Sequence, residues 1–128
     1  MYKLSSTSKK RMKGIDARWF EVTDLALKIS LIDFGIPEFG GLRTADEQYK
    51  LSVKGLSNCD GYEKKSYHQS GKALDVYAYT GGKASWKESD LSLVACAILQ
   101  ASSMLGYKVQ WGGHWSSFKD MPHFQIKD

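Results

Sequence analysis

Glycines divide this chain into short segments, and this division limits the folds open to it. Gly40–Gly41, Gly55, Gly81–Gly82 and Gly106 separate the regularly patterned runs, because glycine ends helices and forms turns. The chain has 128 residues, the length of one ordinary domain, and contains no internal repeat or interdomain linker. We therefore predict a single domain over residues 1–128, built from short elements.

Three segments have the apolar spacing of amphipathic helices, and we expect helices over about 16–30, 44–54 and 89–105. Asp16, Thr44 and Ser89 stand at their starts, where short polar side chains cap the free backbone N–H groups. Thr44 is followed three residues later by Glu47, the spacing of a capping box. Glycines follow the second and third segments and should end those helices.

The remaining patterned runs are short and read as strands, over about 32–39, 73–79, 107–111 and 123–126. Separated helices and short strands are typical of an α+β domain. We expect a small, mostly antiparallel sheet flanked by helices. Residues 1–13 are polar and basic and are expected to form a loosely ordered lead-in, while residues 56–65 should be a polar loop.

The net charge of +4 favours approach to anionic surfaces but does not identify a partner. No recognised nucleic-acid motif is present, so a nucleic-acid-binding domain is disfavoured. No apolar signal region follows the basic start, and no run approaches the roughly 20 apolar residues of a membrane span. We expect a protein made in the cytoplasm without stable membrane insertion.

The two cysteines, Cys59 and Cys96, have no metal-ligand spacing. Cys96 lies in an apolar helical run and is expected to be a buried, inert thiol. Cys59 lies in a polar loop. A disulfide between the two stays open, although a cytoplasmic origin argues against it.

The segment from Ser66 to Asp75 places a carboxylate inside an apolar strand. Strand alternation puts Leu74 and Val76 on one face and Asp75 on the other. Burying a lone charge is costly, so Asp75 needs a partner. A metal ion that is also bound by His68 would supply one.

A second segment, from Asp120 to Phe124, contains another histidine in an unusual setting. Pro122 favours an extended backbone before it, so that His123 shares a strand face with Gln125. Asp120 lies one short turn before His123 and can reach the same site.

Together, His68, Asp75 and His123 form a common catalytic zinc set, with the fourth position open for water. Asp120 lies outside this set and could take the proton from that water. Taken singly, such residues are more often ordinary surface, core or turn residues, and their spacing matches no helical HExxH pattern.

Three stretches carry a family resemblance: the string Ser66-x-His68-x-x-Gly71-x-Ala73-x-Asp75, the stretch WGGHWSSFKDMPHF at 111–124, and GLRTADEQ at 41–48. Together they resemble the zinc D,D- and L,D-peptidases of the hedgehog/D-Ala-D-Ala peptidase fold. The similarity is closest to phage endolysins that are L-alanyl-D-glutamate peptidases.

The resemblance implies roles for individual residues. His68, Asp75 and His123 would bind Zn²⁺, and Asp120 would be the catalytic acid and base. Arg43 would face the substrate and stabilise the oxyanion, although a surface position at a helix start is its ordinary alternative. Substrate-binding roles would fall to Ser66, Gln48 and Trp115, for which local capping or packing is the alternative.

One residue departs from the family pattern. His114 stands between Gly113 and Trp115, where relatives often carry Asp or Asn. A solvent-facing position or one at the rim of the substrate site is expected, and metal ligation by His114 is the less favoured alternative.

The resemblance also implies a function. The whole chain would be one zinc peptidase catalytic domain without a separate wall-binding domain, hydrolysing the L-alanyl–D-glutamate bond of peptidoglycan. The enzyme would act as a monomer, reach the periplasm after a holin opens the membrane, and cause lysis of the cell. A D-alanyl-D-alanine carboxypeptidase of the same fold is the alternative. A metal-bearing binding module without catalysis is another, which the intact Asp120 disfavours.

Overall fold

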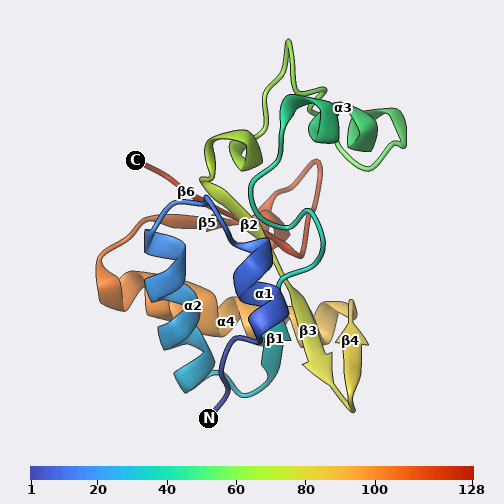
Figure 1. Cartoon of the computed structure of the whole chain (residues 1–128). Helices are drawn as coiled ribbons and strands as arrows, with labels where there is room; N and C mark the ends of the chain where they lie inside the picture. Colours follow the sequence, from blue (N-terminus) through green and yellow to red (C-terminus); the bar gives the residue numbers. More distant parts are fainter.

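The computed structural model describes residues 1–128 and contains two small antiparallel sheets surrounded by helices (Figure 1). The first sheet has the order β1-β3-β4, with strands Asp33–Gly35, Tyr77–Thr80 and Lys83–Ser85. The second has the order β2-β6-β5, with strands Ala73–Asp75, His123–Ile126 and Val109–Trp111. The α-helices are α1 (Ser6–Arg11), α2 (Arg18–Ile29), α3 (Ala45–Val53) and α4 (Glu88–Leu105), and two 3₁₀ turns are η1 (Tyr67–Ser70) and η2 (Gly112–His114).

The core lies between α2, α4 and one face of the second sheet. Apolar side chains of α2 and α4 are buried against each other, as their helical spacing predicts. Leu74 of β2 and Phe124 of β6 are fully buried in the same cluster. One face of the second sheet is thus covered. Side chains alternate between the two faces along a strand, so Asp75 and His123, which are next to Leu74 and Phe124, lie on the other face.

The expected strand over 73–79 divides at Val76 into two strands of different sheets. Asp75 pairs with His123, whereas Tyr77 pairs with Gly35. Between them, the backbone N–H of Val76 donates to the carbonyl oxygen of Pro122. The alternation of buried residues continues through this point, which is why the sequence pattern conceals the change of sheet.

The expectation of a loosely ordered lead-in is wrong. Residues 6–11 form α1, whose N-terminus is capped by the Ser5 hydroxyl accepting from the N–H of Ser8. Ser8 and Met12, one helical turn apart, are both buried. The Ser8 hydroxyl also accepts from the N–H of Ile36. This short polar helix is therefore fixed by two buried positions that its charged neighbours obscure in the sequence.

Two smaller expectations also change. The capping box of Thr44 and Glu47 is confirmed, but Ser89 does not cap α4, which begins at Glu88 after an uncapped Lys87. Cys96 is exposed rather than buried, because it lies on the outer face of α4, and both cysteines are free thiols. No helix combines the length and the apolar character needed to cross a bilayer.

An ion cluster joins the start of α2 to the end of the chain. The Arg18 guanidinium contacts Asp16 at 2.7 Å and Asp128 at 2.9 Å. Lys72 forms ion pairs with the same two carboxylates. Hydrogen bonding from the Arg18 side chain, opposed by burial, lowers the pKa of Asp16 to about 2. The cluster thereby stabilises the ionised carboxylate in the folded state.

This shift has a direction that can be tested. A carboxyl whose pKa falls on folding stabilises the protein above its unfolded pKa, and that contribution disappears as the pH falls through the folded pKa. Asp16→Asn should therefore lower the free energy of unfolding at pH 7 by about 1 kcal/mol, since the pair is partly solvated.

The difference from the parent protein should shrink between about pH 4 and pH 2, as measured by urea unfolding. Asp24→Asn is the matched control. Asp24 forms a solvent-exposed i,i+4 ion pair with Lys28, and such a pair contributes little to stability. An equal loss in both variants, or a loss that does not depend on pH, would contradict the prediction.

Candidate metal centre

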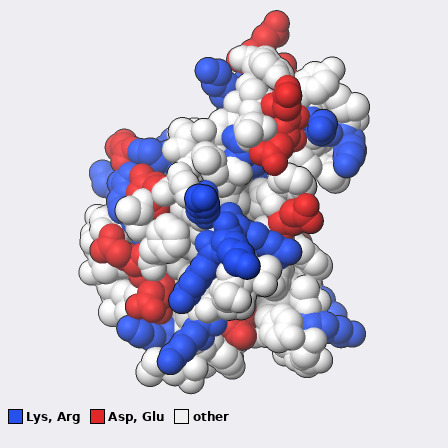
Figure 2. Space-filling view, viewed as in Figure 1, with Lys and Arg blue, Asp and Glu red and all other residues white.

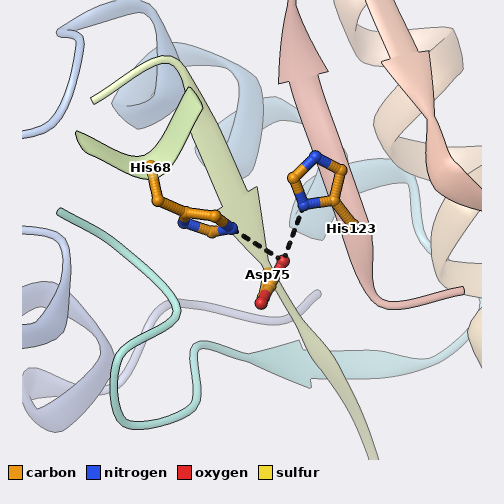
Figure 3. A group of neighbouring side chains, drawn as sticks. All are labelled: His68, Asp75 and His123. Atoms are coloured by element: carbon orange, nitrogen blue, oxygen red, sulfur yellow. Dashed lines mark hydrogen bonds and ion pairs between the residues drawn. The ribbon is translucent and has the colours of Figure 1, made fainter. Parts of the chain in front are cut away.

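Three potential metal ligands converge on the open face of the second sheet. Asp75 and His123 are paired across β2 and β6, and His68 comes from η1, directly before β2. One ligand atom from each of the three lies within 4.8 Å of the others. Figure 3 shows both imidazole rings directed at the carboxylate of Asp75. The structure thus brings together the three residues predicted as ligands from the sequence.

The outer nitrogen of each ring is held by the protein. His68 Nδ1 lies 2.9 Å from the carbonyl oxygen of Gly41, to which it donates. His123 Nε2 lies 2.8 Å from Oε1 of Gln125. The amide nitrogen of Gln125 donates in turn to Gln110 Oε1, which identifies Oε1 as the acceptor for His123. Neutral imidazoles held in this way carry their protons on the outer nitrogens.

The inner nitrogens then present lone pairs to the carboxylate. His68 Nε2 and His123 Nδ1 lie 3.2 Å and 3.1 Å from the same oxygen, Oδ1 of Asp75. Three electron-pair donors facing one another without a proton repel, and a cation between them removes the repulsion. Two nitrogen ligands and one oxygen ligand match the donors that a transition metal such as zinc prefers. The residues therefore fit a metal ion.

The second oxygen of Asp75 is also occupied. Arg43 Nη2 lies 2.9 Å from Asp75 Oδ2, and the arginine side chain is largely buried. Burial alone would raise the pKa of Asp75, but the two histidines, when protonated, lower it well below its usual range through their charge and hydrogen bonds. A metal ion bound in place of those protons would act in the same direction. Asp75 is accordingly an ionised carboxylate, as a metal ligand must be.

Three consecutive backbone carbonyls position the centre. Phe39 O accepts from Arg43 Nε at 2.8 Å, Gly40 O from the N–H of Asp75 at 2.8 Å, and Gly41 O from His68 Nδ1. Phe39 is the only non-glycine residue with positive φ, at 61°. A Cβ on Gly41 would lie 2.2 Å from the carbonyl oxygen of Arg11, at the end of α1. We call residues 39–41 the carbonyl loop.

Arg43 is held on three sides rather than exposed at a helix start. Its Nη1 donates to Gln48 Oε1 at 3.0 Å, in addition to its bonds with Phe39 and Asp75. Gln48 is fully buried, and its amide donates to Ser57 and Cys59. Gln48 thus lies behind Arg43 and does not line the cleft, so its predicted contact with substrate is not matched by its position.

A cleft of about 370 Å³ opens above the three potential ligands. Its lining also includes Arg43, Ser66, Trp115, Phe118 and Asp120. Ser66 has a second role, since its hydroxyl accepts from the N–H of His68 and caps η1. The indole of Trp115 lies against the ring of His123, with 5.2 Å between ring centroids.

Asp120 is fixed by its backbone and stands outside the ligand group. Its N–H donates to Gly112 O at 3.0 Å, and its carbonyl accepts from the N–H of His123. A Cβ on Gly112 would lie 2.2 Å from the carbonyl oxygen of Asp120, so only glycine fits there. Burial, and then the charge of Asp75, raise the pKa of Asp120, while the nearby cationic groups partly oppose them.

His114 does not belong to the metal-ligand group. It is exposed, with its ring centroid 4.8 Å from that of Trp111, and lines a separate groove of about 770 Å³ beside β5. Trp115 lines both cavities. The favoured expectation, that His114 faces solvent, agrees with this position.

Gln125 and the carbonyl loop are the positioning groups that sequence reasoning missed. Gln125 had one available signal, because it stands two residues after His123 and therefore shares its strand face. The carbonyl groups had no such signal, because every residue has a backbone carbonyl and the sequence does not show which of them will face a site. Lys64 and Lys65, which line the cleft from the loop after α3, were also not anticipated.

A two-histidine, one-carboxylate centre in an open cleft, with a further carboxylate beside it, is the arrangement of catalytic metal sites. Residues 1–126 match a family model described as phage L-alanyl-D-glutamate peptidase. The chain therefore belongs to the phage L-alanyl-D-glutamate peptidase family, and the resemblance inferred from its motifs is confirmed.

Individual relatives support this family assignment. The L-alanyl-D-glutamate peptidase of Escherichia phage T5 is 30% identical over 130 residues, covering 98% of this chain and 90% of the relative. The peptidoglycan L-alanyl-D-glutamate endopeptidase CwlK of Bacillus subtilis is 30% identical over 113 residues, covering 74% and 61%. The crystal structure of the Serratia marcescens L-Ala D-Glu endopeptidase ChiX superposes with a TM-score of 0.85 at 32% identity, covering 98% and 90%. The predicted fold class is thereby confirmed, with two sheets in place of one.

The hydrogen bond from His123 to Gln125 predicts an effect on metal affinity. Removing a partner that orients a ligand histidine typically weakens metal binding by about 10–100-fold. Gln125→Ala should do so for Zn²⁺ in a competition titration with a chromogenic chelator, without loss of the fold by circular dichroism. Gln110→Ala is the control, because Gln110 contacts the amide of Gln125 and not the histidine. Unchanged zinc affinity in Gln125→Ala would show that His123 needs no such partner.

Proposed function

We propose that this protein is a zinc endolysin that hydrolyses the L-alanyl–D-glutamate bond in the stem peptides of peptidoglycan. One observation carries the proposal: the lone pairs of His68, Asp75 and His123 meet beside the free carboxylate of Asp120. Membership of the family along nearly the whole chain supports the choice of bond.

Zinc is the proposed metal because the donor set is two imidazoles and one carboxylate. A bound Zn²⁺ would polarise the scissile carbonyl and lower the pKa of a coordinated water to about 7. His68, Asp75 and His123 would hold the ion. Gly41 O and Gln125 would keep the two rings in the tautomers that ligation requires.

Asp120 is the proposed acid and base. Its carboxylate would accept a proton from the attacking water and deliver that proton to the departing amine of D-glutamate. Burial and the charge of Asp75 raise its pKa in the metal-free chain, and its place in the cleft lets it exchange a proton with a bound water during turnover. The tight contact between Gly112 and Asp120 keeps this side chain in the cleft.

Arg43 would stabilise the oxyanion formed from the scissile carbonyl. A guanidinium has five N–H donors in a fixed plane, and three of its nitrogens already bond to Phe39, Gln48 and Asp75. The remaining N–H groups are available in the cleft that Arg43 lines. Trp115 and Ser66 are proposed to contact the stem peptide.

The biological setting is proposed from membership of the phage peptidase family. The enzyme would be synthesised in the host cytoplasm, act as a monomer, and reach the wall once a holin has opened the membrane. Peptidoglycan would be its partner, and lysis of the host its result. The alternative activity is that of a D-alanyl-D-alanine carboxypeptidase, and the two activities differ in their products.

Product analysis tests the bond directly. Digestion of purified peptidoglycan should create new N-terminal D-glutamate, identified by derivatisation of free amines and mass spectrometry. No free D-alanine should be released. Free D-alanine as the main product would instead establish the carboxypeptidase. Pre-treatment with a chelator should abolish either reaction, and added Zn²⁺ should restore it.

Asp120→Asn separates the proposed proton transfer from metal binding. Asn has nearly the shape of Asp but cannot accept the proton, so turnover should fall by roughly 10²–10⁴-fold. Zinc content and melting temperature should stay close to those of the parent protein, because Asp120 is neither a ligand nor an ion-pair partner. Turnover, zinc content and melting are measured on one preparation. A folded, zinc-loaded variant with nearly full turnover would rule out this mechanism.

A further inference from the structure

The positive charge of this protein is concentrated at its N-terminus. Residues 1–15 contain five Lys and Arg and no Asp or Glu, whereas the whole chain carries +4, so residues 16–128 together carry a net charge of −1. The five residues are Lys3, Lys9, Lys10, Arg11 and Lys13, and we call them the N-terminal basic surface. In Figure 2, a group of Lys and Arg side chains lies in the middle of the face shown, over α1.

The fold leaves these five charges without an acidic partner, although the half-buried Arg11 also donates to the carbonyl oxygen of Ile36 at 2.9 Å. None of the five forms an ion pair, although several other basic residues do. Lys3, Lys9, Lys10 and Lys13 are exposed, because the buried positions of this segment are Ser8, Met12 and Ile15. None of the five lines the catalytic cleft. The proposed reaction therefore makes no use of this surface.

Two exposed apolar side chains belong to Leu42, beside the end of α1, and to Phe39, in the carbonyl loop that packs against Arg11 through Gly41. Leu42 contacts Gly14, with Cδ2 3.0 Å from the position a Cβ would take there, and 44% of Leu42 is exposed. Phe39, at the start of the carbonyl loop, is 43% exposed. Its positive φ is costly for an aromatic residue, and strain of this kind is often retained for function.

We propose that the N-terminal basic surface, with Leu42 at its edge and Phe39 in the adjoining carbonyl loop, binds the surface of an anionic phospholipid bilayer. Phosphodiester headgroups attract Lys and Arg, and aromatic and aliphatic side chains next to cations enter the boundary between headgroups and acyl chains. Single-stranded nucleic acid could stack a base on Phe39, but it offers no apolar phase for the aliphatic Leu42 side chain, whereas the boundary between headgroups and acyl chains accepts both. This binding is peripheral and does not depend on the proposed reaction.

The proposal is tested on the full-length protein with vesicles of phosphatidylglycerol and phosphatidylethanolamine, using phosphatidylcholine vesicles as the neutral reference. Each Lys near an anionic bilayer raises binding about fivefold. The triple variant Lys9→Gln, Lys10→Gln, Lys13→Gln should therefore lower the partition coefficient by roughly 100-fold. Cleavage of soluble stem peptides should be unchanged. Leu42→Gln should weaken binding severalfold at a salt concentration that screens the charges.

The matched control is Lys50→Gln, Lys54→Gln, Lys83→Gln, which removes the same charge from exposed positions elsewhere. It should reduce vesicle binding far less, which supports a defined surface. Equal losses in the two triple variants would overturn the proposal, as would absent binding or equal binding to neutral vesicles. Binding through the same lysines to DNA or to purified cell wall, but not to vesicles, would overturn it too.

Discussion

The carbonyl loop is the constraint on which the catalytic centre depends. Its three successive carbonyls fix the arginine, the carboxylate strand and one histidine through bonds of 2.8–2.9 Å. Such a sequence of carbonyls can face one centre only if the backbone departs from regular structure, which Phe39 does with its positive φ. The buried end of α1 then supports the loop from behind, since Gly41 packs against Arg11.

The centre combines two kinds of order. His123 and Asp75 face each other because their strands are paired, so sheet register alone brings them together. His68 lies on the 3₁₀ turn η1 and Asp120 on a loop, and their neighbours Gly41 and Gly112 have no room for a side chain. The regular sheet thus sets the spacing of two potential ligands, and close-packed loops add the third and the free carboxylate. Preorganisation of this sort is what a metal-dependent hydrolase requires.

Sequence patterns predicted the elements that carry strong local signals. The capping box at Thr44 and the strand over 123–126 are found as expected, and the specific motifs identified the residues of the centre. The change of sheet at Val76 could not be predicted, because buried and exposed residues continue to alternate across it. The order of α1 was missed because Ser8 is the only residue buried within it, with Met12 buried directly after it. The positions of Gln48 and Cys96 depended on tertiary packing, which no local pattern encodes.

The change of sheet at Val76 also places the hairpin of β3 and β4 in a different sheet from the candidate metal centre. The hairpin of β3 and β4 extends away from β2, β5 and β6 (Figure 1), and a Cβ added at its turn glycines, Gly81 and Gly82, would meet no other part of the chain within 4 Å. Only the first sheet contains this hairpin, whereas the second holds the centre. The turn is thus a natural insertion point, where a second folded module could be grafted in mid-chain while both termini and the cleft stay as they are.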